Sequence, residues 1–278
     1  MEIKSQFKQH GGELIFYTHD STVNNCPMSF AVYLPPQAKE HNVPVLYFLS
    51  GLTCTEENFM IKSGAQRFAA EHGLALVTMD TSPRDLGFEG EDDSYDFGAG
   101  ASFYLNATEQ PWSKNYQMYD YVVNELPQLI NENFPVIADK QSIFGHSMGG
   151  HGALMIALRN PDKYQSVSAF SPIVAPSQTA WGIKAFKGYL GEDRSSWAQY
   201  DAVELVKSTD SKLPLFIDQG KDDEFLGEYL KPELLTAACV AKDHPLELRM
   251  QAGYDHSYYF ISSFIKDHIA YHAKHLVD

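Results

Sequence analysis

Ser147 lies in a glycine-containing run that could make its hydroxyl a nucleophile. The run is GHSMG at positions 145–149, with one glycine two residues before the serine and another two residues after it. Glycines at these spacings let the chain close a sharp turn that side chains would obstruct. A serine on such a turn presents its hydroxyl in strained backbone, with the free N–H groups of the next helix pointing at whatever it attacks. The five-residue pattern alone is weak, so the interpretation depends on other residues.

A serine hydroxyl needs a base to accept its proton and an acid to orient that base. In folds built around this turn, the order along the chain is serine, acid, histidine. Asp222 and Asp223 follow a predicted strand and compete for the role of the acid. Asp223 is preferred because it lies directly before the largely apolar segment Glu-Phe-Leu at 224–226. His256 follows the last predicted strand in a turn that contains glycine, and is the predicted base.

The other histidines are weaker candidates. His268, His272 and His275 belong to the predicted C-terminal helix, so they are expected at the surface or in packing. His146 and His151 flank the serine, but no third ligand with suitable spacing accompanies them. The sequence therefore predicts neither a metal site nor a cofactor.

Acyl transfer also requires donors for the negative oxygen of its intermediate. The N–H of Met148, directly after the serine, is the first expected donor. The loop at 50–55 follows a buried strand, and Gly51 permits the turn that would present the N–H of Leu52 as the second. An ordinary turn is the alternative interpretation of Gly51. Cys54 in the same loop is expected to lie near the pocket as a thiol that is not catalytic.

Strands and helices alternate around these residues. Period-two alternation at 13–18 and 28–34 predicts antiparallel strands at one edge of a sheet. Buried strands are predicted at 44–49, 74–79, 141–144, 167–170, 213–218 and 246–250. Helices are predicted at about 57–71, 117–133, 150–158, 229–241 and 258–275. This order predicts an α/β protein with the α/β-hydrolase fold, in which a mostly parallel central sheet carries helices on both faces.

No composition break or flexible linker divides the chain, so one domain is expected over residues 1–278. The segment at 80–111 is long, irregular and rich in Gly, Asp and aromatic residues. Loops of this length in compact domains are usually functional or disordered, and the aromatic content favours an ordered excursion around a pocket.

Composition excludes several classes of protein. The net charge of −15 argues against a nucleic-acid surface and against a polybasic membrane anchor. No apolar run approaches the length of a membrane span, and the N-terminus lacks the apolar core of a signal peptide. Three scattered cysteines are typical of a reducing compartment, so a cytoplasmic protein is expected.

The chain resembles the S-formylglutathione hydrolase (esterase D) family in several segments. They lie at 51–59, 82–84, 90–98, 115–119, 144–154 and 218–226. The resemblance implies a thioesterase that releases formate and glutathione in formaldehyde detoxification, with side activity on short-chain esters. It also implies that Ser147 is the nucleophile, His256 the base and Asp223 the acid, and it suggests a homodimer.

One departure from the family concerns the substrate pocket. The family often has a cysteine shortly before the Trp-Gly step, whereas the segment at 176–182 has none. This leaves the catalytic residues untouched but affects the expected shape of the pocket. Trp181 is expected either to line this pocket or to anchor a loop as a buried aromatic residue.

Three alternatives to this function remain open. The first is a general short-chain carboxylesterase without a preference for glutathione. The second is an acyltransferase that passes the acyl group to a sugar or an alcohol. The third is a catalytically silent hydrolase fold that serves as a binding module.

Overall fold

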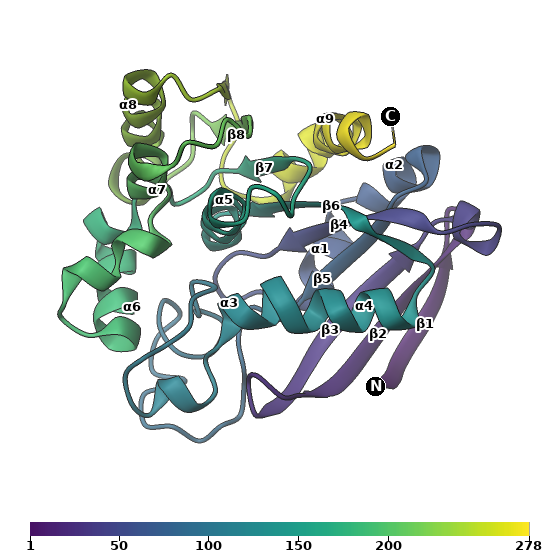
Figure 1. Ribbon diagram of the computed structural model, residues 1–278, viewed down its shortest axis with the longest axis horizontal. Helices are drawn as coiled ribbons and strands as arrows, with labels where there is room; N and C mark the ends of the chain where they lie inside the picture. The colour runs from purple at the N-terminus through teal and green to yellow at the C-terminus, as the bar shows by residue number, and fades with distance from the viewer. Residues whose placement is uncertain (278) are drawn as a thin grey trace.

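One continuous sheet runs through the computed structural model, which describes residues 1–277; residue 278 lies outside the described part. The nine strands are ordered β1-β2-β3-β5-β4-β6-β7-β8-β9 (Figure 1). Their bounds are β1 (Glu2–Gln9), β2 (Gly12–Ser21), β3 (Cys26–Leu34), β4 (Val43–Leu49), β5 (Ala75–Met79), β6 (Val136–His146), β7 (Val167–Phe170), β8 (Leu215–Gly220) and β9 (Leu246–Gln251).

The sheet is antiparallel at one edge and parallel in the rest. The pairs β1–β2, β2–β3 and β3–β5 are antiparallel. The antiparallel strands predicted at 13–18 and 28–34 correspond to β2 and β3. All pairs from β5 through β4 to β9 are parallel. The parallel arrangement brings the carboxyl ends of β4, β6, β7, β8 and β9 to the same end of the sheet. The α/β class and the mostly parallel sheet are confirmed.

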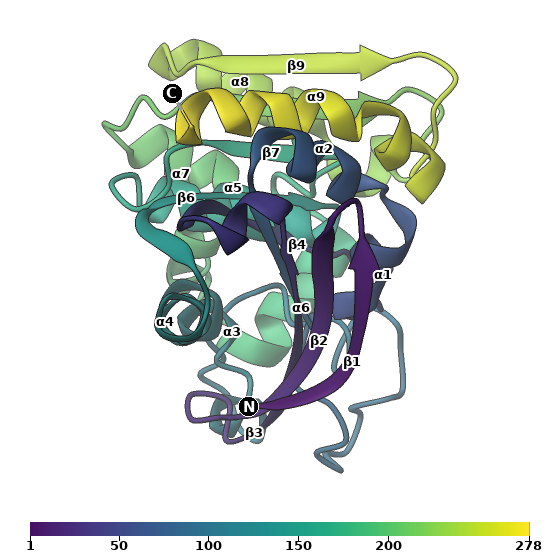
Figure 2. The same cartoon turned by 90° about the vertical axis from the view of Figure 1, so that its right-hand side faces the viewer.

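Helices cover both faces of this sheet (Figures 1 and 2). Their bounds are α1 (Glu56–Lys62), α2 (Ala65–His72), α3 (Met118–Asp120), α4 (Leu126–Asn133), α5 (Met148–Arg159), α6 (Ala180–Leu190), α7 (Ala202–Ser208), α8 (Pro232–Lys242) and α9 (Tyr258–Leu276). Helices α1, α2 and α9 share one hydrophobic core with the sheet, and α4 to α8 share the other. No helix within residues 1–277 is both long and apolar enough to cross a membrane.

The helix predicted at 57–71 is wrong in one respect, because the chain forms α1 and α2 with a break between them. Gly64 in the break has a φ of +71°, a backbone conformation that a continuing helix cannot contain. The helix predicted at 117–133 is present, with a wider turn over Tyr121–Glu125 between α3 and α4. Two helices, α6 and α7, were not predicted.

Two strands also differ from the expectation. Strand β1 was not predicted, because most of its side chains are exposed and it shows no alternation. Strand β9 is not a fully buried strand: it forms the other edge of the sheet, and its side chains are half-buried or exposed.

The segment at 80–111 forms neither helix nor strand, as expected. It packs against the loop that follows β4, since the N–H of Thr53 donates to the carbonyl of Gly100 over 2.9 Å. The hydroxyl of Ser82 accepts from the N–H of Gly100 over 2.7 Å, and the hydroxyl of Tyr189 accepts from Gly98 over 2.8 Å. The segment therefore holds the loop after β4 beside the end of the sheet.

Candidate active site

Ser147 lies on a strained turn between β6 and α5. Its backbone has a φ of +58° and a ψ of −119°, a conformation that non-glycine residues rarely adopt. Gly145 and Gly149 must be glycines because a larger side chain at either position would clash with the backbone. A Cβ atom on Gly145 would lie 2.2 Å from the carbonyl oxygen of Gly149, and one on Gly149 would lie 2.0 Å from that of Leu49. The sequence GHSMG therefore folds into this turn because only glycine fits two residues before and two residues after the serine.

Backbone hydrogen bonds hold the turn in place. The N–H of Ser147 donates to the carbonyl of Phe170 at the end of β7 over 3.0 Å. The carbonyl of Ser147 accepts from the N–H of His151 over 2.9 Å, which begins the hydrogen bonding of α5. These contacts fix the nucleophile candidate relative to the carboxyl ends of the parallel strands.

His256 and Asp223 meet beside this turn. The Nδ1 atom of His256 lies 2.6 Å from the Oδ2 atom of Asp223. The carboxylate also accepts from the backbone N–H of Phe225 over 2.9 Å and from the amide of Gln219 over 3.2 Å. The side chain of Asp223 is buried, whereas Asp222 is exposed. The structure thus brings Asp223, rather than Asp222, against the histidine.

The environment of Asp223 keeps it charged. Burial alone would raise the pKa of its carboxyl group, but the hydrogen bonds from His256 and from the Phe225 N–H outweigh it and hold the pKa below its ordinary value. A charged carboxylate accepts a hydrogen bond from Nδ1–H, so the neutral imidazole carries its lone pair on Nε2. That nitrogen is then available to accept a proton.

Ser147 and His256 line the same cavity, which has a volume of about 360 Å³. The other lining residues come mainly from the loop after β4, from α1 and from the start of α9. Together the cavity is lined by Gly51, Leu52, Thr53, Cys54, Asn58, Lys62, Tyr95, His146, Ser147, Trp181, Phe225, His256, Ser257 and Tyr258. The sequence analysis missed several of these residues, Lys62 and Tyr95 among them, because their elements reach the cavity only through tertiary packing.

The loop after β4 lies directly against the serine. A Cβ atom on Gly51 would come within 3.2 Å of the Cβ of Ser147 and within 3.3 Å of Nδ1 of His146. Among residues 1–277, neither the N–H of Leu52 nor that of Met148 has a hydrogen-bond acceptor. Two unpaired donors beside a nucleophile are the arrangement that an oxyanion requires.

Cys54 and Trp181 both line the cavity. Burial raises the pKa of the Cys54 thiol, although the positive charges of Lys62 and Arg84 oppose this effect. The thiol is therefore protonated at neutral pH and is a weak nucleophile. Trp181 also anchors its surroundings: its ring stacks on Tyr229 with centroids 3.8 Å apart, and its N–H donates to the hydroxyl of Tyr95 over 3.1 Å.

The other histidines considered above form no side-chain hydrogen bond with Ser147 or Asp223 within residues 1–277. The ring of His146 lies 4.5 Å from that of His256, but burial holds its pKa well below the ordinary value, so it is neutral. His151 contacts the carbonyl of Phe103 over 3.1 Å. His268 and His272 are buried in packing rather than at the surface, while His275 is exposed. No cluster of metal-ligating side chains occurs within residues 1–277.

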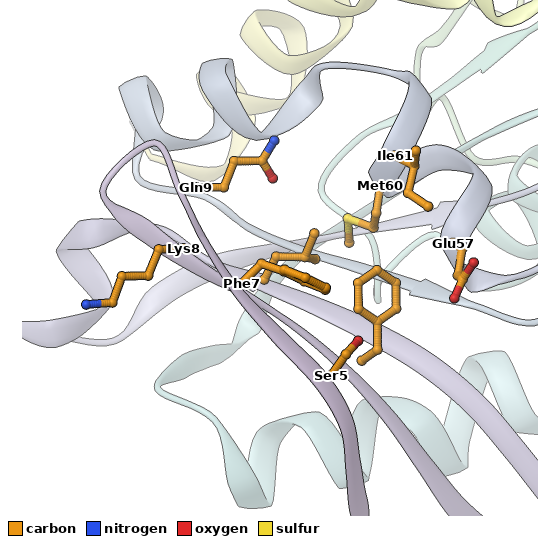
Figure 3. Close-up of a pocket in the computed structure, with 9 residues that line it drawn as sticks. Ser5, Phe7, Lys8, Gln9, Glu57, Met60 and Ile61 are labelled. Atoms are coloured by element: carbon orange, nitrogen blue, oxygen red, sulfur yellow. The ribbon is translucent and has the colours of Figure 1, made fainter.

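A second cavity, of about 470 Å³, lies between β1, β2 and α1 (Figure 3). Phe7 and Met60 face its interior, while the ammonium group of Lys8 points away from them. The lining contains no histidine, cysteine or aspartate. Ser5, Lys8 and Glu57 do line it, but no hydrogen bond joins their side chains within residues 1–277, so no serine is paired there with a base as a nucleophile requires. The chemistry therefore belongs to the cavity that contains Ser147.

The turn, the histidine and the carboxylate occupy the carboxyl ends of parallel strands in the order serine, acid, histidine. This combination of fold and site defines a hydrolase of the α/β-hydrolase fold. The family model described as "Putative esterase" matches residues 21–271. The chain belongs to the S-formylglutathione hydrolase family within these esterases.

Three relatives document this membership. The S-formylglutathione hydrolase of Mus musculus is 60% identical over 96% of this chain and 95% of its own length. The S-formylglutathione hydrolase of Arabidopsis thaliana is 57% identical over 94% of this chain and 92% of its own length. The solved structure of an S-formylglutathione hydrolase from Agrobacterium tumefaciens superposes with a TM-score of 0.97 at 50% sequence identity. The match covers 99% of this chain and 100% of that chain.

Proposed function

We propose that the chain is a serine thioesterase that hydrolyses S-formylglutathione to formate and glutathione, with side activity on short-chain esters. One observation carries the proposal: Ser147 and the Asp223-bound His256 line a single cavity. The chain also belongs to a family whose members are named for that substrate.

The first half of the reaction forms an acyl-enzyme. Nε2 of His256 accepts the proton of Ser147 as Oγ attacks the thioester carbonyl, and the oxygen of that carbonyl becomes negative. The N–H groups of Leu52 and Met148 donate to this oxygen. The C–S bond then breaks, the leaving sulfur takes the proton from Nε2 of His256, glutathione departs as a thiol, and the formyl group stays on Ser147.

The second half returns the enzyme to its starting state. A water molecule gives a proton to Nε2 of His256 and attacks the formyl ester of Ser147. The ester bond breaks, the proton returns to Oγ, and formate leaves. Asp223 stabilises the positive imidazole in both halves because its carboxylate stays charged beside Nδ1.

A kinetic comparison of thioesters and esters tests this function. Purified protein is assayed with S-formylglutathione, S-acetylglutathione, p-nitrophenyl acetate and p-nitrophenyl octanoate. We expect kcat/KM for S-formylglutathione to exceed that for p-nitrophenyl acetate by roughly tenfold or more, since discrimination of this size needs only a few additional contacts. The long ester should be the slowest substrate.

Each alternative predicts a different result. Equal or better activity on p-nitrophenyl acetate would indicate a general short-chain carboxylesterase. Product that forms only with an added sugar or alcohol would indicate an acyltransferase. Failure to react with a fluorophosphonate probe would indicate a silent fold that serves as a binding module.

The proposal also covers the number of domains, the location and the oligomeric state of the protein. We infer one domain, because the sheet is continuous from β1 to β9. We infer a cytoplasmic protein, because Cys26, Cys54 and Cys239 are all free thiols. The homodimer stays a prediction from the resemblance, which light scattering on the purified protein tests.

A further inference from the structure

We propose that Lys62 binds the glycine carboxylate of the glutathionyl group and so selects glutathione thioesters over uncharged esters. This inference rests on the proposed function and deepens it. It assigns a specificity-determining residue to a cavity in which the reacting groups do not themselves distinguish one thioester from another.

Lys62 occupies the rim of the cavity close to the base. It is the last residue of α1, the short helix that follows the loop with Leu52. Its ammonium group lies 5.6 Å from the ring centroid of Tyr258, a distance at which a cation and an aromatic ring attract. Tyr258 begins α9, two residues after His256. The contact thus holds the charge beside the catalytic histidine.

The charge of Lys62 is not neutralised by the protein. Lys184, Lys187 and Lys207 each form an ion pair with a nearby carboxylate. Within residues 1–277, Lys62 forms none, and the cavity lining contains no aspartate, glutamate or arginine. Lys62 is therefore the one lysine or arginine among the residues that line the cavity. Its field also reaches the interior, because it opposes the rise in the pKa of Cys54.

Overall charge makes a local cation necessary. The protein has a net charge of −15, which repels an anionic substrate at long range. Glutathione thioesters have two carboxylates and one ammonium group. An unpaired lysine at the rim compensates for this repulsion where the substrate enters.

The chemistry of glutathione indicates which end binds. At the γ-glutamyl end an ammonium group lies beside the carboxylate, so a lysine is repelled as well as attracted. At the glycine end the carboxylate stands alone and its charge is uncompensated. A single cation without an acidic neighbour fits the glycine end best, because opposite charges within a few ångströms attract and like charges repel.

The test compares the effect of replacing Lys62 with the effect of esterifying the glycine carboxylate, each change alone and both together. Lys62→Met removes the charge but keeps an unbranched side chain, and Lys62→Arg keeps the charge. Each protein is assayed with S-formylglutathione, with its glycine ethyl ester, and with p-nitrophenyl acetate. Lys39→Met is the matched control, because Lys39 is an exposed lysine outside the cavity.

We expect Lys62→Met to raise KM for S-formylglutathione by about two- to fivefold, the size of an exposed charge pair, with kcat nearly unchanged. Esterification of glycine should impose a similar loss on the unsubstituted protein and little further loss on Lys62→Met. Lys62→Arg should retain most of the affinity. Activity on p-nitrophenyl acetate should change much less than activity on S-formylglutathione, and Lys39→Met should behave like the unsubstituted protein.

Two results would overturn the assignment. An equal loss on p-nitrophenyl acetate would mean that Lys62 only supports the structure. An equal loss on esterification in both proteins would mean that the glycine carboxylate binds elsewhere. Failure of the proposed function is visible separately, as a lack of preference for S-formylglutathione in the unsubstituted protein, and the same comparison with S-acetylglutathione then still decides the role of Lys62.

Discussion

Nδ1 of His256 lies 2.6 Å from Oδ2 of Asp223, although the two residues are 33 positions apart in the chain. The contact exists because β8 and β9 are parallel neighbours, so the loops that follow them emerge at the same end of the sheet. Ser147 follows β6 at that end as well. Strand order therefore places the three residues at one end of the sheet, with Ser147 and His256 lining one cavity, and each can be tested by itself.

Asp223→Asn should abolish most of the activity without unfolding the protein. The amide can no longer accept from Nδ1–H as a charged group, so the imidazole loses its favoured tautomer; the equivalent change in another serine hydrolase lowers kcat by about 10⁴-fold. The measurement is kcat for p-nitrophenyl acetate, with circular dichroism as the check on folding. Asp222→Asn is the matched control and should stay near full activity, since Asp222 is exposed. Full activity in Asp223→Asn would exclude it as the acid.

Gly51→Ala should impair turnover through the oxyanion donors. The added methyl group would lie 3.2 Å from the Cβ of Ser147, so the loop and the serine turn must separate by a few tenths of an ångström, which changes the position of the Leu52 N–H relative to Ser147. We expect kcat to fall by on the order of 10²-fold, the lower end of the cost of losing one donor. Gly227→Ala is the control, because nothing lies within 4 Å of the added group. An unchanged kcat in Gly51→Ala would argue that the loop supplies no donor.

Cys54→Ser should keep its activity, while bulky thiol reagents should inhibit the unsubstituted protein. The thiol lines the cavity, but burial raises its pKa, so it blocks the site when modified and takes no part in the reaction. The comparison is kcat/KM of both proteins before and after treatment with N-ethylmaleimide. A folded but inactive Cys54→Ser protein would contradict this interpretation.

Glu56→Gln should stabilise the protein in alkaline but not in acidic solution. Burial raises the pKa of Glu56 from 4.5 to about 7. The unfolded chain therefore loses this proton first, so stability falls as the pH rises from about 4.5 to 7 and stays lower above that. We expect a gain of about 1–3 kcal/mol in the free energy of unfolding at pH 8 and little at pH 4.5, measured with urea.

Glu57→Gln is the control for this substitution, because Glu57 is on the same helix but its side chain is exposed. It should change stability little at either pH. An equal gain for Glu56→Gln at both pH values would show that the carboxylate is not the source of the penalty.

The sequence was informative where local geometry is forced. The spacing of glycines around Ser147 predicts a turn that only small residues allow, and the apolar run at 213–218 predicts the parallel strand that precedes Asp223. The break at Gly64 was not predicted: Ser63-Gly64 is a turn signal, but polar and apolar positions continue across it at helical spacing. Lys62 and Tyr95 could not be assigned to the cavity, because the orientation of α1 and the path of residues 80–111 depend on contacts with distant parts of the chain.

The most direct test of this account is a comparison of the unsubstituted protein with Ser147→Ala. We expect kcat for S-formylglutathione to fall by about 10⁶-fold, the typical cost of removing such a serine. A fluorophosphonate probe should add to Ser147 in the unsubstituted protein and to no residue in the variant, as read by mass spectrometry. Turnover within about tenfold of the unsubstituted protein, or a label on another residue, would contradict the assignment of Ser147 as the nucleophile.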